Sequence, residues 1–202
     1  MIRLTQRSGH DMAPARMKRH WAALAVAAIT AVMVLVVRLE GRVWFCECRT
    51  LLFWIADAYS EHTSQHLLDP YSLTHLQHGL IFYWFLAWLA PRASWQTRLV
   101  AATAIEASWE IVENSAFVIN RYREATAALG YTGDSVINSL GDLLSCVIGF
   151  AIAGKIGWRW TLALFVGIEV VLVLWIRDSL LLNVLMLFYP VEAIKNWQTN
   201  GN

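Results

Sequence analysis

The sequence is poor in charged residues. Only 15% of its 202 residues are Asp, Glu, Lys or Arg, whereas an average soluble domain carries about 25%. The net charge is +1, so the chain has no basic excess that would attract nucleic acid, and we expect no nucleic-acid partner. Glycine-rich phosphate loops, His-Glu-x-x-His pairs and Gly-x-Ser-x-Gly elbows are also missing, so the sequence does not point to the enzyme classes that depend on them.

Apolar residues dominate the composition of the chain. They make up 57% of the chain, and its eleven tryptophans suit the headgroup region of a bilayer, since indole combines an apolar body with one hydrogen-bond donor. We therefore predict an all-α, polytopic transmembrane helix bundle in the cell inner membrane, in contact with the lipid bilayer. Residues 1–20 are expected to form a basic cytoplasmic tail, and residues 21–202 a single integral membrane domain.

Five apolar stretches are long enough to cross a bilayer, which takes about 20 helical residues. Asp69 and Pro70 favour a helix start, Pro91 favours a helix stop, and Gly133 precedes a further apolar stretch. A last stretch is too short to cross unaided. The predicted spans are residues 21–37, 70–90, 98–120, 134–154 and 158–176, with a possible short segment at residues 179–190.

The basic residues predict the orientation. With the N-terminus in the cytoplasm, ten of the 16 Lys and Arg residues fall on the cytoplasmic side and six on the other, as expected from the positive-inside rule. The longest loop, residues 40–68, then lies on the extracytoplasmic side of the membrane, and so do residues 121–133.

The third predicted span carries three carboxylates on one helical face. Glu106, Glu110 and Glu113 stand at positions i, i+4 and i+7. Moving an ionised carboxylate out of water costs several kcal/mol even after relaxation. This face must therefore contact protein, water or a cation rather than lipid.

Two neighbouring spans carry matching polar residues. His75 and His78 lie one turn apart in the second span, and Asn138 and Asp142 follow Asp134 at intervals of four in the fourth. Two questions stay open. The histidines either join helices or form a site, and Asp134 either caps its helix or binds a ligand. A stripe of small residues beside the acidic one predicts close helix packing, namely Gly141, Ser145, Gly149 and Ala153.

In this orientation the polar residues of four segments meet near the outer side of the membrane, which predicts a water-accessible, outward-facing cleft. The candidate catalytic residues are Glu110, Glu113, His78 and Asp142. The candidate metal ligands are His75, His78, Glu110 and Glu113, and the candidate substrate-binding residues are His66, Asn138 and Arg177. Imidazole with carboxylate suits zinc, iron or manganese, so a divalent metal is the candidate cofactor.

Cys46 and Cys48 form a Cys-x-Cys pair in the long outer loop. Cysteines this close together close a small ring, so a structural disulfide is not the expected outcome. Metal binding and free thiols stay open for this pair.

A series of polar motifs runs in order along the chain. They are Cys46-x-Cys48, Ser64-Gln65-His66-Leu67, Thr74-His75, His78-Gly79, Glu106-x-x-Trp109-Glu110-x-x-Glu113-Asn114, Tyr122-Arg123, Gly133-Asp134-Ser135, Asn138-Ser139, Arg177-Asp178 and Tyr189-Pro190. From about residue 41 onward, the chain thereby resembles an uncharacterised family of Gram-negative multi-pass inner-membrane proteins. The resemblance implies a membrane location and a shared polar core, but no activity. Glu61-His62-Thr63 departs from the Glu-Asn pair of that family, and this stretch is left out of the predicted site.

The leading hypothesis is a membrane enzyme whose intramembrane site opens outward. It would use a metal ion or acid-base chemistry on a lipid or lipid-linked substrate. Two alternatives stay open. A scaffold or assembly subunit would use its polar residues to join helices or to bind a membrane-protein partner, and a proton-coupled carrier would relay charge along the three glutamates.

Overall fold

A computed structural model describes residues 13–126 and 130–200. Within these residues the chain is all-helical, with seven helices and no strand, so the predicted all-α class is confirmed. The helices are α1 (Ala13–Leu39), α2 (Ser72–Leu89), α3 (Trp95–Glu113), α4 (Ala116–Ala125), α5 (Val136–Ile176), α6 (Leu180–Phe188) and α7 (Glu192–Thr199).

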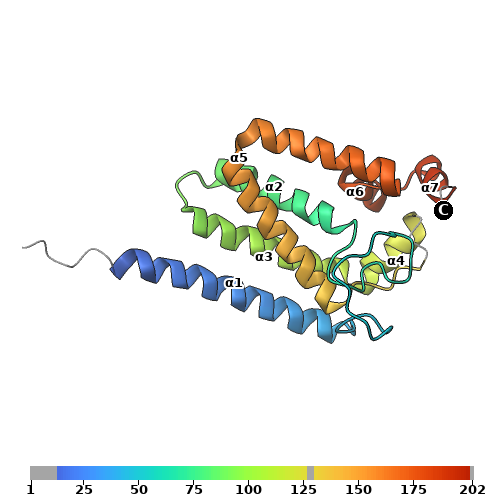
Figure 1. Cartoon of the computed structure of the whole chain (residues 1–202), viewed down its shortest axis with the longest axis horizontal. Coiled ribbons are helices and arrows are strands. Elements are labelled where there is room, and N and C mark those ends of the chain that lie inside the picture. Colours follow the sequence, from blue (N-terminus) through green and yellow to red (C-terminus); the bar gives the residue numbers. More distant parts are fainter. Residues whose placement is uncertain (1–12, 127–129, 201–202) are drawn as a thin grey trace, which may run out of the picture.

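The long helix α5 consists of two limbs. Gly157 has φ 74° and ψ 166°, a conformation that glycine adopts without the steric cost of a Cβ. The chain folds back at this point (Figure 1). The two limbs correspond to the predicted spans at residues 134–154 and 158–176.

The third predicted span ends earlier than expected. We predicted a helix over residues 98–120, but α3 stops at Glu113 and α4 begins at Ala116. Ser115 caps α4, since its side chain accepts a hydrogen bond from the backbone N–H of Val118. The amide of Asn114 turns instead toward the start of α5, which shows how a short polar side chain can end a helix by bonding elsewhere.

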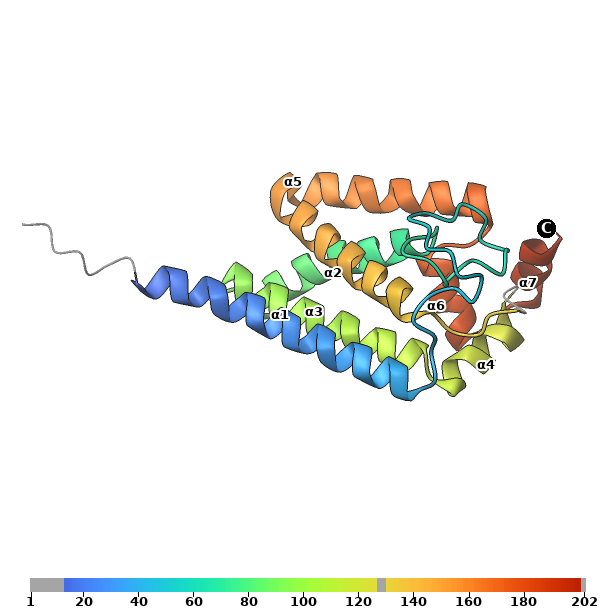
Figure 2. The ribbon, with the colours of Figure 1, turned by 60° about the horizontal axis from the view of Figure 1, so that its bottom comes forward.

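Five helical segments run along the length of the bundle: α1, α2, α3 and the two limbs of α5. In Figures 1 and 2 the loop that connects α1 to α2, the short helices α4, α6 and α7, and both outer ends of α5 lie at one end of the molecule. The turn between α2 and α3 and the bend at Gly157 lie at the other end. Most of the polar candidates lie in the turns of α2, α3 and α5 nearest to the first of these ends, since α2 and α5 begin there and α3 ends there.

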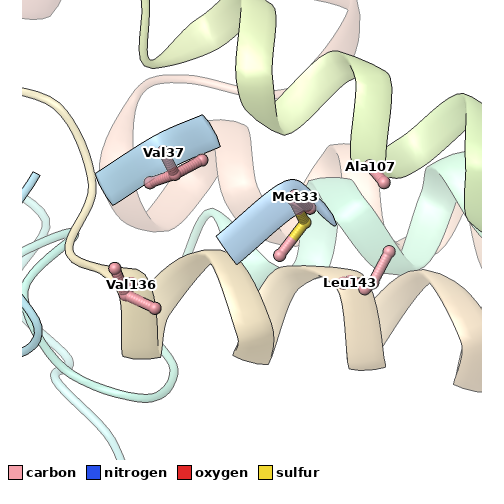
Figure 3. Packing of buried hydrophobic residues seen from close by; sticks show 5 residues of the cluster. All are labelled: Met33, Val37, Ala107, Val136 and Leu143. Carbon is pink, nitrogen blue, oxygen red and sulfur yellow. The ribbon is translucent and has the colours of Figure 1, made fainter. Parts of the chain in front are cut away.

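Helix α1 packs against α3 and the first limb of α5. Met33 and Val37 of α1 contact Ala107 of α3 and Val136 and Leu143 of α5, and all five side chains are buried (Figure 3). This apolar cluster holds α3 so that its opposite, acidic face is directed toward α2.

Helix α2 approaches the first limb of α5 so closely that backbone contacts backbone. A Cβ added to Gly79 would lie 2.0 Å from the carbonyl oxygen of Cys146, and one added to Gly149 would lie 2.0 Å from that of Leu76. Only glycine fits at either position. The close packing predicted from the small-residue stripe is confirmed.

Two of the described helices have the length and composition of a membrane span. These are His20–Leu39 and Val136–Ile176, and only 17% and 22% of their most apolar stretches are buried inside the protein. The prediction of five to six membrane segments goes further than this and stays a prediction.

Two matched alanine substitutions in α5 test the contact between α2 and α5. Gly149→Ala should destabilise the bundle by about 1 to 3 kcal/mol, because its Cβ would overlap the Leu76 carbonyl oxygen. Gly167→Ala has no neighbour within 4 Å of its Cβ and should be neutral or slightly stabilising, since alanine has the higher helix propensity. Thermal unfolding of both variants in detergent measures the difference. Equal unfolding temperatures would show that the backbone contact is not tight.

Candidate functional site

The acidic face of α3 meets both histidines of α2 inside the bundle. Glu106 Oε1 lies 2.6 Å from His75 Nδ1, and Glu106 Oε2 lies 3.0 Å from His78 Nδ1. Glu106 has no exposed surface, so this carboxylate bridges two imidazoles away from water. Sequence reasoning placed Glu106 on the acidic face but left it out of the candidate ligands, although its spacing of four from Glu110 could have included it.

Glu110 lies one turn further along α3, beside the same histidine. Its Oε1 atom is 3.3 Å from His75 Nδ1, but the hydrogen bond of that nitrogen goes to Glu106. Glu110 is completely buried, and neither of its carboxylate oxygens has a hydrogen-bond partner among the described residues. A buried oxygen without a partner costs about 1 to 3 kcal/mol, and more when charged. This position is therefore suited to a proton or a cation.

Two overlapping sets of ligand atoms result from this arrangement. One set consists of His75, His78 and Glu106, and the other of His75, Glu110 and Glu113. Within each set the ligand atoms lie within 4.8 Å of one another. The structure therefore brings all four predicted metal ligands together and adds Glu106 to them.

The first limb of α5 contributes Asp142 to the same region. Ser72, in the first turn of α2, donates a hydrogen bond of 2.6 Å from Oγ to Asp142 Oδ1. Asp134 lies just before the helix and is not its cap, because Ser135 has that role. Asp134 instead accepts hydrogen bonds from Asn114 Nδ2 and from the hydroxyl of Tyr131, both at 3.0 Å.

A cavity of about 470 Å³ leads to these residues from the end of the bundle that holds the long loop. His75, Glu113 and Asp142 form part of its wall. Its other ionisable lining residues are Tyr59, Glu61, Tyr71, Tyr122, Tyr131, Asp134 and Asp178. None of the described lining residues is Lys or Arg, so the cavity has an acidic and aromatic wall.

The three predicted substrate-binding residues are not among the residues that line this cavity. Asn138 is buried in α5, and its Nδ2 has no hydrogen-bond partner among the described residues. Arg177 donates a hydrogen bond of 2.9 Å to the carbonyl of Trp197 and lies over the indole ring. His66 faces the cysteine pair in the long loop. Sequence reasoning did not list Asp178 and the four tyrosines as candidate site residues, and they come together only through the fold.

The structure pairs Cys46 and Cys48 as a disulfide, which the sequence analysis did not favour. A tight turn brings the two residues together: the N–H of Arg49 donates to the carbonyl of Cys46, and Arg49 has a φ of 61°. His62, left out of the predicted site, lies with its Nδ1 3.5 Å from Cys46 Sγ.

Burial strongly affects the carboxyl groups at the loop end of the bundle. Burial raises the pKa of Asp178 to about 7, although hydrogen bonds from the Ser179 N–H and from Tyr71 partly oppose it. Burial also raises the pKa of Asp134, against hydrogen bonds that include those from Tyr131 and Asn114. Asp178 therefore exchanges its proton close to neutral pH.

Fold and site together define an all-helical protein that encloses a His–Glu cluster beneath an acidic cavity. The chain belongs to the family described as "Protein of unknown function (DUF2585)", whose model matches residues 19–200. Similar proteins are a UPF0314 protein of Brucella anthropi, 46% identical over 88% of this chain and 90% of its own length, and one of Sphingopyxis alaskensis, 45% identical over 88% and 95%. A third, from Rhizobium meliloti, is 44% identical over 87% and 89%. No solved structure matches the chain significantly.

The raised pKa of Asp178 predicts how stability depends on pH. The carboxyl has a pKa of 3.8 when unfolded and about 7 when folded, so its contribution to stability is complete below pH 4 and is lost as pH rises through 7. Between pH 6 and 8 this amounts to about 1.4 kcal/mol. Asp178→Asn removes the titrating group, so its unfolding temperature should fall less over that range than that of the unchanged protein.

Unfolding temperatures measured in detergent from pH 6 to 8 provide the test. Asp57→Asn is the control, since it makes the same change at an exposed carboxylate and should follow the unchanged protein. Parallel pH profiles for Asp178→Asn and the unchanged protein would refute the raised pKa.

Proposed function

We propose that this chain is a multi-pass inner-membrane protein that binds a divalent metal ion at its buried His–Glu cluster and carries out chemistry on a lipid or lipid-linked substrate. The proposal rests on two neighbouring carboxylates. Glu106 bridges His75 and His78, and the buried oxygens of Glu110 have no hydrogen-bond partner among the described residues. Two imidazoles with two or three carboxylates make a donor set that suits zinc, iron or manganese.

Segment length and surface support five crossings of the membrane. α2, α3 and the two limbs of α5 have 18 to 21 residues each, or roughly 27 to 31 Å at 1.5 Å per residue. This length fits a hydrocarbon core of about 30 Å. Large apolar side chains face outward on α1 and on the second limb of α5, including Leu24, Leu35, Val170 and Leu174, which suits contact with lipid.

A bound divalent ion would supply a Lewis acid and could lower the pKa of a coordinated water. Glu110 would hold the ion through one oxygen, and its second oxygen is the proposed general base, because neither atom has a hydrogen-bond partner among the described residues. Glu113 and Asp142, which reach the cavity wall, would position the substrate or pass protons between the cluster and the cavity.

The cavity wall narrows the class of substrate. Without Lys or Arg among its described lining residues, the cavity lacks the side chains that usually bind a phosphate. Carboxylates and tyrosines favour a neutral or cationic group. The reacting part of the proposed lipid substrate is therefore neutral or cationic.

A scaffold function is the second candidate, and a specific observation favours it. Gln77 of α2 donates to Glu169 of α5 at 2.9 Å, and Glu169 also accepts from the backbone N–H of Leu180. Ser72 and Asp142 form a similar link. These bonds join helices without any ligand, so some of the polar residues serve the packing alone.

Metal analysis of the purified protein with its disulfide intact tests the proposed function. The unchanged protein, loaded with manganese, iron or zinc and then dialysed, should retain about one divalent ion per chain. Glu106→Gln, His78→Ala and Glu110→Gln should each lower the affinity at least ~10-fold, and the double variant of His78 and Glu110 should lose little more, because both act in one site. Glu192→Gln, at an exposed position on α7, is the control.

The scaffold function gives the opposite result. The substitutions would then lower the unfolding temperature while the unchanged protein binds no metal at any concentration tested. Folded protein that retains full metal binding in all three single variants would also overturn the proposed site.

The proposed crossings also predict where the C-terminus lies. α6 is only nine residues long, and α7 lies next to α4, where Lys195 donates to the carbonyl of Glu124. α7 therefore stays at the same end as residues 40–68. Alkaline phosphatase fused after Asn202 or inserted in residues 40–68 should be active, because it lies on the extracytoplasmic side. Green fluorescent protein at the same positions should not fluoresce. Fluorescence at Asn202 would show that the last segment crosses.

A further inference from the structure

The loop between α1 and α2 places four metal-binding side chains around one point. We call this group the loop cluster; it consists of Cys46, Cys48, His62 and His66. Two backbone features hold it together. The N–H of Cys46 donates to the carbonyl of Gln65 at 3.0 Å, which joins the two halves of the loop, and the N–H of Gln65 donates to the carbonyl of His62 at 3.1 Å, which forms the turn between the histidines.

Three of the distances between the ligand atoms are those of a tetrahedral metal site. Cys46 Sγ lies 3.5 Å from His62 Nδ1, Cys48 Sγ lies 3.8 Å from His66 Nε2, and the two nitrogens are 3.5 Å apart. With zinc–sulfur bonds of about 2.3 Å and zinc–nitrogen bonds of about 2.0 to 2.1 Å, a tetrahedron has edges of roughly 3.3 to 3.8 Å. The two sulfur atoms depart from this geometry because they are joined as a disulfide, and all four ligand atoms lie within 4.8 Å of one another.

We propose that the loop cluster binds a zinc-class divalent ion when its two cysteines are reduced. Two thiolates and two imidazoles form a common donor set of structural zinc sites. The ion takes the place of the two thiol protons, which pass to solvent. This proposal does not depend on the proposed function, since no residue of the loop cluster belongs to the buried His–Glu cluster.

Metal binding and the disulfide exclude each other at the loop cluster, and each state has its own hydrogen bonds. In the disulfide state the N–H of Leu52 donates to His66 Nδ1 at 3.1 Å, so the ring proton lies on Nε2 and faces His62. A metal ion on Nε2 requires that proton on Nδ1. Metal binding therefore breaks the hydrogen bond from the Leu52 N–H to His66.

The loop cluster lies next to the cavity above the His–Glu cluster. Cys46, Cys48 and His62 line an open cavity of about 550 Å³. Glu61, Gln65, Thr132 and Asp134 line both this cavity and the cavity of about 470 Å³ above the His–Glu cluster. The loop cluster therefore lies beside a wall that both cavities share.

Cobalt(II) is the probe for the test, because its absorption spectrum reports thiolate ligands and tetrahedral geometry directly. The full chain in detergent, reduced under anaerobic conditions with a phosphine, should bind one cobalt ion at the loop cluster, and this ion should give thiolate-to-metal charge-transfer bands. The disulfide form should show none of these bands. Zinc added to the cobalt form should remove them by displacement.

Variants separate the loop cluster from the buried site. Cys48→Ser and His62→Ala, both at positions that are at least partly exposed, should weaken cobalt binding at least ~10-fold, while His20→Ala, a histidine outside the cluster, should not. The bands should persist in Glu106→Gln, so failure of the buried site leaves this result intact. Reduced, folded protein with free thiols but no charge-transfer band would overturn the proposal, as would unchanged cobalt affinity in His62→Ala.

Discussion

The burial of carboxylates between helices with apolar outer surfaces is the constraint on which the structure depends. Glu106 and Glu110 have no exposed surface, and removing a charged group from water costs several kcal/mol unless it finds a partner. Glu106 finds two, His75 and His78, on a different helix. The relative position of α2 and α3 is therefore tied to these contacts.

The same constraint explains the glycines in the helix contact. α2 supplies the histidines, so it must lie close to α3 and still pack against α5. Gly79 and Gly149 permit this, because each lies where a Cβ would overlap a backbone carbonyl oxygen of the other helix. Small residues that allow close approach are typical of helix contacts in membranes, where apolar burial drives association less than it does in water.

The polar contacts divide into two kinds with different consequences. Those of Glu169 are complete within the protein, since its Oε1 accepts from Gln77 and from the Leu180 N–H and its Oε2 accepts from the Leu181 N–H. Glu110 has no such bond. A structural role accounts for the first kind and leaves the second unexplained, and this difference favours a ligand at the His–Glu cluster over packing alone.

The sequence by itself determined the helical class, most of the segment boundaries and the small-residue contact, because these depend on periodicity, on Gly and Pro, and on spacing within one segment. It also indicated His75, His78, Glu110 and Glu113, since ionisable residues in apolar stretches are conspicuous. The fold decided what spacing cannot show. It added Glu106 as the bridge between the histidines, assembled the cavity wall from the long loop and helices α2 to α7, and brought His62 and His66 to the cysteine pair. These contacts join residues far apart in the chain, and only the packing of several helices fixes such distances.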